Sequence, residues 1–157
     1  MTVDEAQLRT HVRRLLAWRD AHADFDAAVK GMAPELRGVQ PAGLPYSAWQ
    51  LLEHMRLAQQ DILEFCVDPA YRERQFPDDY WPSSPAPEGD QWEKSIAGFR
   101  ADLKALEKLA DEAALFDRIP HGTGQTNLRE LLLVADHNAY HVGQLVLVRR
   151  LLGDWPG

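Results

Sequence analysis

Two histidines, His137 and His141, stand four residues apart in a stretch with the residue pattern of a helix. Side chains at this spacing lie on one helix face, one turn apart, so both imidazoles can converge on one point. Such a pair commonly supplies two nitrogen ligands to a metal ion, although the spacing also arises by chance. Taken alone, the spacing is compatible with a metal site and also with an ordinary pair of helix histidines.

The surroundings of the pair favour the metal site. Residues 131–135 are apolar all round, and apolar residues continue between positions 142 and 148. This pattern predicts a central helix rather than a surface helix. Imidazoles are costly to bury there unless their nitrogens find partners, and one metal ion satisfies both rings.

A third histidine, His54, is the best candidate for a ligand from another helix. It lies roughly 60° from the middle of the apolar stripe on its own expected helix, which points it toward the edge of the core. The same position suits a half-buried histidine bonded to a carbonyl or a carboxylate. Both interpretations of His54 stay open.

Two familiar metal patterns are excluded by the residues next to these histidines. A zinc protease helix needs Glu directly after its first His, where this chain has Asn138. A di-iron bundle needs Glu three residues before a ligating His, and those positions hold Leu51, Val134 and Asn138. What remains is a three-histidine site with an open coordination position, for which zinc is the default ion and nickel is compatible.

The other polar candidates are weaker. Four residues lie one or two turns from the expected ligands: Gln50, Asp61, Tyr140 and Gln144. They could support the ligands or line a pocket beside them, and they could equally be ordinary polar residues of a helix surface. We expect the remaining histidines and the one cysteine to be structural: His11 and His22 at the boundary of one face of the first helix, His121 solvated, and Cys66 a small core residue.

Four stretches combine a helix-start signal with apolar residues at helical spacing. They begin at Thr2 with Glu5, at Ser47 with Gln50, at Asp90 with Glu93, and at Thr126 or Asn127, and they end near Gly31, Cys66, Ala113 and Leu152. Between the second and third stretches, the Pro-rich residues 67–89 carry Phe76, Tyr80 and Trp81, which suggests that this connection packs onto the body.

These stretches predict an all-α fold, with residues 1–157 as a single domain. A connection as long as residues 67–89 can span the length of a bundle, so the second and third helices can run parallel to each other. The expected architecture is therefore a four-helix bundle in up-down-down-up order with a long Pro-rich crossover between helices 2 and 3.

Composition narrows the function further. The chain has 157 residues, with 24 Asp and Glu against 17 Lys and Arg, and a formal net charge of −7. Without a basic run, binding to nucleic acid or to a membrane surface is not expected. The one cysteine excludes an internal disulfide, and no apolar run is long enough to span a bilayer. Because no secretory signal is recognised either, we expect a cytoplasmic protein with a small-molecule or protein partner.

The sequence resembles the DinB/YfiT-like superfamily of bacterial proteins. The resemblance lies in residues 47–54 and 136–145, extends to residues 81–82 and 92–99, and covers essentially the whole chain. It implies an up-down-down-up bundle, often dimeric, that holds a divalent metal ion with three histidines. At the matching positions these are His54, His137 and His141.

Relatives of known activity include transferases and isomerases that use a low-molecular-weight thiol such as bacillithiol or mycothiol. The resemblance thus implies a thiol-dependent S-transferase that acts on small electrophiles in stress or detoxification. A non-catalytic metal- or ligand-binding module and a hydrolase that uses metal-bound water are the alternatives. The last helix is apolar over much of its circumference, at Leu132, Leu133, Val146 and Leu147, and this predicts a homodimer that buries part of the first or last helix.

Overall fold

The computed structural model describes residues 4–17 and 21–156, and this part of the chain is helical. The helices are α1 (Glu5–Leu16), α2 (Phe25–Val29), α3 (Ala48–Val67), α4 (Gln91–Glu112) and α5 (Asn127–Leu151), with single 3₁₀ turns at Pro34–Leu36 and Asp78–Tyr80. Among the described residues there is no strand, only an isolated bridge between Arg118 and Thr126. The expected all-α class is confirmed.

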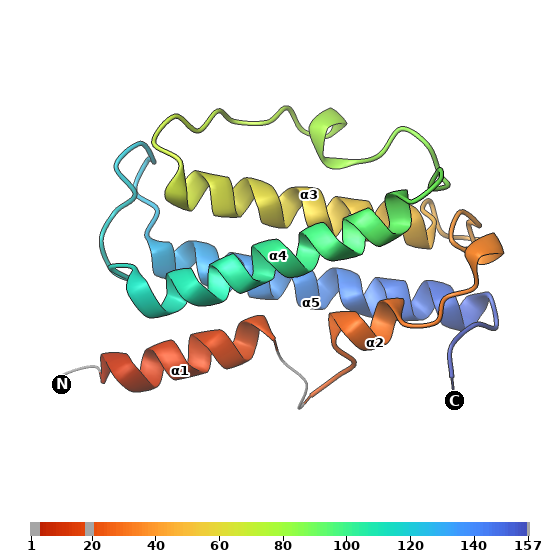
Figure 1. Ribbon diagram of the computed structural model, residues 1–157, viewed down its shortest axis with the longest axis horizontal. Coiled ribbons are helices and arrows are strands. Elements are labelled where there is room, and N and C mark those ends of the chain that lie inside the picture. Colours follow the sequence, from red (N-terminus) through yellow and green to blue (C-terminus); the bar gives the residue numbers. More distant parts are fainter. Residues whose placement is uncertain (1–3, 18–20, 157) are drawn as a thin grey trace.

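Three long helices, α3, α4 and α5, lie along one another, and α1 and α2 follow each other along the side away from α3 (Figure 1). In this view α3 and α4 run in one direction, whereas α1 and α5 run in the other. The segment between α3 and α4, residues 68–90, returns along the whole length of α3 (Figure 1). We call it the crossover.

The first expected helix is wrong as a single element. The chain instead forms α1, which is capped by Asp4, and later begins α2 at a new cap, Asp24. The Asp24 side chain accepts from the backbone N–H of Ala27 at 2.7 Å, which satisfies a donor that a continuous helix would pair internally. The expected cap at Thr2 lies outside the described residues.

The second expected helix is confirmed as α3, together with its capping box. The Ser47 hydroxyl accepts from the backbone N–H of Gln50, and the Gln50 side chain accepts from the backbone N–H of Ser47. This reciprocal pair satisfies two orphan donors at the start of the helix. It fixes where α3 begins, and therefore where His54 lies along it.

The remaining two helices begin where the sequence indicates. Thr126 caps α5 with its side chain, as expected. Asp90 occupies the cap position of α4, but it makes no capping hydrogen bond, so the expected capping box with Glu93 is wrong. Its carboxylate instead pairs with the ammonium of Lys94 at 2.9 Å.

The core consists of two clusters of buried apolar side chains. One joins α2, α3, the first half of α4 and the second half of α5, and includes a stacked ring pair, Phe25 and Phe99. The other joins α1, the end of α4 and the start of α5. Because α5 packs against each of the other four described helices, it is the central helix of the fold. None of the described helices combines the length and the apolar composition that a bilayer span requires.

The crossover packs onto the body, as its aromatic residues predict. The Ser47 hydroxyl donates to the carbonyl of Pro85, and Ala86 lies directly against Gly38. At the other end of the crossover, the Arg74 guanidinium pairs with the Glu64 carboxylate of α3 at 3.0 Å. The crossover is thus held to the rest of the chain near both of its ends.

We expect Gly38→Ala to destabilise the protein by loosening this packing. A Cβ at Gly38 would overlap the Cβ of Ala86 and lie 2.8 Å from its Cα. Overpacking of this kind costs about 1–3 kcal/mol of unfolding free energy. Chemical denaturation of metal-free protein measures the loss.

Gly143→Ala in α5 is the matched control for this change. A Cβ there meets no heavy atom within 4 Å, so the better helix propensity of alanine should raise the unfolding free energy by about 0.5–1 kcal/mol. An unchanged stability of Gly38→Ala would contradict the close approach of the crossover.

Candidate metal centre

Three of the six histidines meet between α3 and α5, beneath the crossover. His54 lies in the second turn of α3, and His137 and His141 lie on successive turns in the middle of α5. The side chains of His54 and His141 are 6% and 8% exposed, and that of His137 is partly buried. These are the three histidines that the sequence singles out.

The inner nitrogens of these rings are spaced as the ligands of one ion would be. The Nε2 atom of His54 lies 3.2 Å from that of His141 and 3.2 Å from that of His137. One ligand nitrogen from each ring lies within 4.8 Å of the other two. In a tetrahedral site with metal–nitrogen distances of about 2.0–2.1 Å, neighbouring nitrogens are roughly 3.3 Å apart. The observed spacing therefore fits a single divalent ion.

The hydrogen bonds of the outer ring nitrogens determine whether the inner nitrogens carry a hydrogen or a lone pair. His54 Nδ1 lies 2.9 Å from the carbonyl oxygen of Tyr80, which can only accept, so Nδ1 carries the hydrogen. In the same way His141 Nδ1 donates to Gln144 Oε1 at 2.7 Å. A neutral imidazole has one N–H, so the two Nε2 atoms face each other with lone pairs. The two lone pairs repel each other, and a cation placed between them would be attracted to both.

Burial keeps the three rings uncharged. It lowers the pKa of His137 to about 4 and that of His141 to about 4, and in both cases the neighbouring histidines add to the effect. Burial also lowers the pKa of His54. The hydrogen bond to the Tyr80 carbonyl raises this pKa, but its effect is smaller than that of burial. The neutral imidazole is the form that binds a metal.

Two crossover residues complete the surroundings of His54. The Trp81 indole stacks on the imidazole with 3.9 Å between ring centroids and 2° between planes, and the preceding residue, Tyr80, supplies the carbonyl acceptor. Sequence reasoning predicts that these aromatic residues pack onto the body but misses their place at the site. Their presence in an otherwise Pro-rich connection indicates that they pack onto the body, but it does not indicate that they pack against His54.

Asp61 reaches the cluster only through Tyr80. Its carboxylate accepts from the phenol of Tyr80 at 2.6 Å and from that of Tyr71 at 3.0 Å, and it also lies 3.4 Å from the Arg74 guanidinium. Burial and the hydrogen bond to Asp61 raise the pKa of Tyr71 to about 12 and raise that of Tyr80 as well. Both phenols therefore stay protonated and keep donating. Asp61 anchors the residue that orients His54.

The other three polar candidates differ in their relation to the cluster. Gln144 bonds His141 directly, and the Tyr140 ring lies edge-on to the His141 ring with 5.0 Å between centroids. Tyr140 is also 64% exposed, so it borders the site on the solvent side. Gln50 is engaged in the cap of α3 through Ser47. A supporting role in metal binding stays a prediction for each.

The remaining histidines and the cysteine lie away from the cluster. His11 and His22 are exposed, and because α1 ends before His22 the expectation that they share one helix face is wrong. His121 is exposed but bonds the Phe65 carbonyl through Nε2 at 2.8 Å, so it is held rather than simply solvated. Cys66 is partly buried, and burial raises the pKa of its thiol to about 12, which makes it a poor nucleophile.

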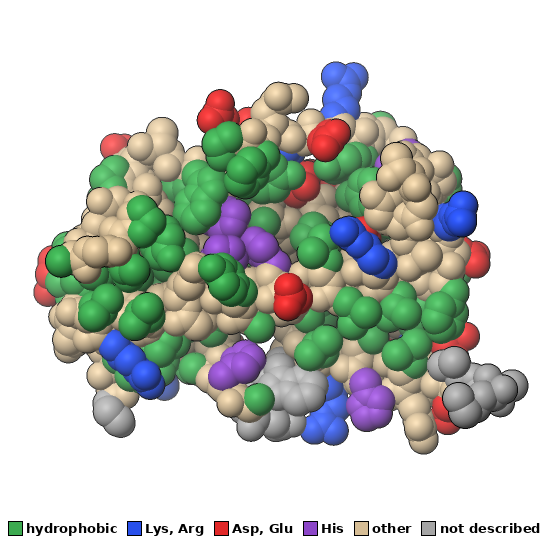
Figure 2. All heavy atoms as spheres, turned by 180° about the vertical axis from the view of Figure 1, so that it is seen from behind, with side chains coloured by type: hydrophobic (Ala, Val, Ile, Leu, Met, Phe, Trp, Pro, Cys, Tyr) green, Lys and Arg blue, Asp and Glu red, His purple; other side chains and the backbone are tan. Residues whose placement is uncertain are grey.

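The cluster is reachable from solvent. His137 is partly exposed, and Figure 2 shows histidine side chains gathered in a hollow on the face opposite to that of Figure 1. Hydrophobic side chains border this hollow in the same view. A small molecule with an apolar part could therefore approach the three rings.

A comparison with protein families agrees with this arrangement. The model of the DinB superfamily matches residues 17–145, a span that contains all three histidines of the cluster. The chain belongs to the DinB superfamily. No curated protein and no solved structure matches it.

The donor set of this DinB superfamily member suits a resident divalent ion. Within the described residues, the group that could hold a metal comprises the three histidines and no carboxylate or thiolate. Three neutral imidazoles suit zinc and nickel better than calcium or magnesium, which prefer oxygen ligands. The family match and the geometry thus support a metal site at the same residues.

We expect the metal-free protein to lose stability as the pH falls from about 6.5 to about 4. In this window the unfolded chain protonates His137 and His141, whereas burial keeps both rings neutral in the native state. The unfolded state therefore binds more protons, and the unfolding free energy drops with pH. Denaturation of chelator-treated protein at several pH values measures this slope.

His141→Gln is the matched variant for this measurement, because its amide does not titrate. Subtracting its pH profile from that of the wild type removes the contribution of carboxylates that titrate in the same range. Parallel profiles for the two proteins would contradict the lowered pKa of His141.

Proposed function

We propose that this protein is a metal-dependent enzyme, a thiol-dependent S-transferase that acts on small electrophiles in stress or detoxification. The observation that carries the proposal is the convergence of three neutral imidazole nitrogens on one point, at His54, His137 and His141. Zinc or nickel is the expected ion. A non-catalytic metal- or ligand-binding module is the competing function.

The charge of the site favours thiol chemistry. Bound by three uncharged ligands, a divalent ion keeps its full double charge and would lower the pKa of a thiol or a water molecule held beside it. A hydrolase that uses metal-bound water commonly pairs the metal with a nearby carboxylate base. The described part of the chain places none in the histidine group, and Asp61 is occupied by two phenols. A thiol, which is far more acidic than water, needs no such base.

The residues around the cluster have definite tasks in this proposal. The Tyr80 carbonyl and Gln144 hold two of the rings by their Nδ1–H groups. The Trp81 ring covers His54 and keeps water from that side, which leaves the hollow beside Tyr140 as the approach for thiol and electrophile. The hydrophobic border of the hollow suits an electrophile with an apolar body.

The proposal includes an architecture and a location. We take α1, α3, α4 and α5 as one four-helix bundle in up-down-down-up order, which the helix directions in Figure 1 support. We place the protein in the cytoplasm, where low-molecular-weight thiols are kept reduced. Its net charge of −7 argues against a nucleic acid or an anionic membrane surface as partner.

We also propose a homodimer that forms through α5. This helix carries a stripe of exposed apolar side chains at Leu132, Leu147 and Leu151, which lie within about 100° of one another around the helix and so share one face. Exposed apolar stripes on a helix are typical of interfaces between protein chains.

Metal content and thiol response test the enzymatic proposal together. Wild-type protein should hold about one divalent ion per chain, and His137→Ala or His141→Ala should lose most of it. In cobalt-substituted protein, the matching low-molecular-weight thiol should produce a sulfur-to-metal charge-transfer band. His54→Ala should abolish both the band and thiol transfer to a generic electrophile, because only His54 contributes from a second helix.

His11→Ala is the control, because His11 is an exposed histidine outside the cluster. It should retain metal, band and transfer. Full metal content in both α5 variants would remove the three-histidine site. Fully metallated protein that gives no spectral change with a broad panel of thiols would refute the transferase and favour the binding module or the hydrolase.

The dimer is tested by sedimentation. Leu147→Asp places a charge in the middle of the α5 stripe and should shift the wild-type dimer to a monomer, by at least about tenfold in dissociation constant. Phe116→Asp, an exposed apolar residue in the connection between α4 and α5, should leave the dimer intact. A wild-type protein that is monomeric at every concentration would refute the interface.

A further inference from the structure

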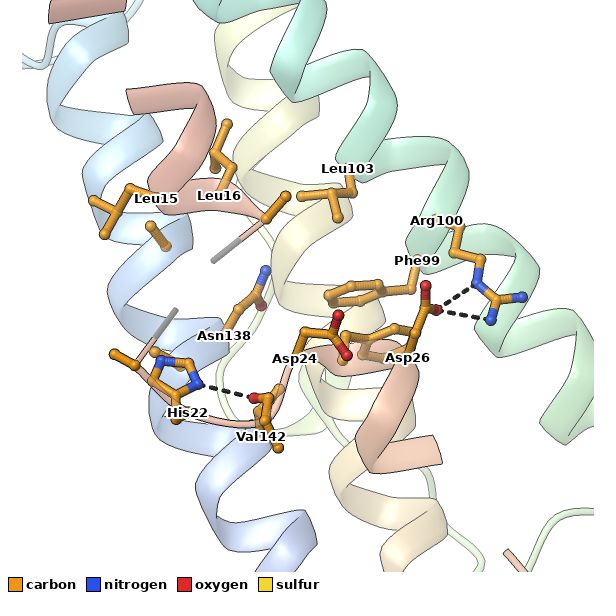
Figure 3. A pocket seen from close by; sticks show the side chains of 16 residues that line it. Leu15, Leu16, His22, Asp24, Asp26, Phe99, Arg100, Leu103, Asn138 and Val142 are labelled. Carbon is orange, nitrogen blue, oxygen red and sulfur yellow. Dashed lines mark hydrogen bonds and ion pairs between the residues drawn. The ribbon is translucent and has the colours of Figure 1, made fainter. Parts of the chain in front are cut away.

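The two sides of α4 border different pockets. On one side Phe99, Arg100 and Leu103 line a pocket that α4 shares with α5 (Figure 3). On the other side Ser95 and Gly98 line a pocket of about 450 Å³, which α3 and the crossover complete. Every residue that lines this second pocket belongs to the described part of the chain. We call it the α3–α4 pocket.

The α3–α4 pocket is separate from the histidine cluster. Trp49, Glu53 and Arg56 contribute to it from α3, and their spacing of four and three residues places them on one helix face. At about 100° per residue, His54 leaves α3 at least about 100° away from each of the three. A ligand in this pocket would therefore not reach the three rings.

Two buried donors at the α3–α4 pocket have no partner. Trp49 is 4% exposed and Ser95 is 2% exposed, and neither the indole Nε1 nor the hydroxyl makes a hydrogen bond within the described part of the chain. Buried polar groups nearly always have partners, so these two need an explanation. An indole N–H can only donate and a hydroxyl can also donate, so an acceptor would satisfy both. Because both residues line the pocket, a molecule bound in it could supply that acceptor.

The acceptors of the lining itself are already engaged. Both carboxylate oxygens of Glu53 accept from the Arg56 guanidinium, at 2.9 and 2.5 Å. The Ser84 hydroxyl donates to the carbonyl of Ala86 at 2.8 Å and accepts from its backbone N–H at 3.3 Å. These groups are therefore not free to satisfy the two donors.

The charge of the lining favours an anionic acceptor. Glu53 and Arg56 neutralise each other, and the other charged residue of the lining is Lys94. The Lys94 ammonium pairs with Asp90 at 2.9 Å, but the side chains of this pair are 74% and 69% exposed. Exposed pairs of this kind are weak, so the ammonium can also attract an anion in the pocket.

We propose that the α3–α4 pocket is a second ligand site, which binds a small carboxylate with a compact apolar or aromatic body. The carboxylate oxygens accept from the Trp49 N–H and the Ser95 hydroxyl, and the Lys94 ammonium supplies the opposite charge. The body of the ligand packs against the Trp49 ring and Pro82, which both line the pocket. The site depends neither on the metal nor on the proposed transferase activity.

Benzoate and benzamide are the probes, because they have nearly the same shape and differ in charge. Titration of the purified, metal-loaded protein, followed by nuclear magnetic resonance, should show saturable binding of benzoate about tenfold tighter than that of benzamide. Trp49→Phe and Ser95→Ala each remove one donor and should weaken benzoate binding about tenfold. Lys94→Gln, at an exposed position, should bring the affinity for benzoate close to that for benzamide.

Trp155→Phe is the matched control, because Trp155 lies under the Arg149 guanidinium and does not line the pocket. It should leave the affinity for benzoate unchanged. Circular dichroism and metal content of every variant should match the wild type, and Ser95→Ala should not lower the melting temperature of the ligand-free protein, because it removes an unpaired hydroxyl.

Three results would overturn the proposal. One is that the wild type shows no saturable binding of benzoate, in which case an ordered water partners the two donors. Another is that benzoate and benzamide bind equally, or that benzoate binding survives Ser95→Ala and Lys94→Gln unchanged. The third is that benzoate binding disappears when the metal is chelated, which would place benzoate at the histidine cluster. None of these results depends on whether any thiol is transferred.

Discussion

Two uncharged imidazoles face each other with their lone pairs, and most of the structure around them serves to keep them there. His54 and His141 cannot relieve the repulsion by turning, because each is held from behind by an acceptor, the Tyr80 carbonyl and Gln144. Protonation would relieve it, but burial opposes the charged form. Because neither rotation of the rings nor their protonation relieves the repulsion, the arrangement is suited to binding a cation.

The demands of this arrangement explain the layout of the helices. One ligand pair needs a helix that is buried on most sides, and α5 packs against each of the other four described helices. The third ligand needs a neighbouring helix with a fixed start, which the capping box at Ser47 and Gln50 provides. The crossover needs to pass over His54, and its contacts at Asp61 and Gly38 hold it in that position.

The sequence predicts what depends on local spacing and little of what depends on contacts between distant segments. The helical class, the start of α3 and the grouping of His54 with the α5 pair follow from periodicity, caps and apolar surroundings. The break between α1 and α2 does not, because an apolar pattern continues through it, whereas in the structure α1 ends at Leu16 and the Asp24 carboxylate, which accepts from the backbone N–H of Ala27, caps a new helix.

The same distinction applies within the site. The sequence identifies Gln144 as a neighbour of His141, because the two residues lie one turn apart on the same helix. Trp81 and the carbonyl of Tyr80 are not, because the distance along the chain from His54 carries no information about a stacked ring or a backbone acceptor. For His54 the two interpretations drawn from sequence are compatible: the ring bonds a carbonyl with one nitrogen and joins the cluster with the other.

The hydrogen bond between His54 and Tyr80 also couples two equilibria, which are the binding of an ion at the cluster and the opening of the crossover. The carbonyl selects the ring tautomer that can bind a metal, so a crossover that lifts away releases that choice and removes the Trp81 stack as well. Thermodynamic reciprocity then requires that occupancy of the cluster lower the equilibrium constant for opening of the crossover by the factor by which the closed crossover tightens occupancy. Protection of the crossover amides from hydrogen exchange would thus report on what the three rings hold.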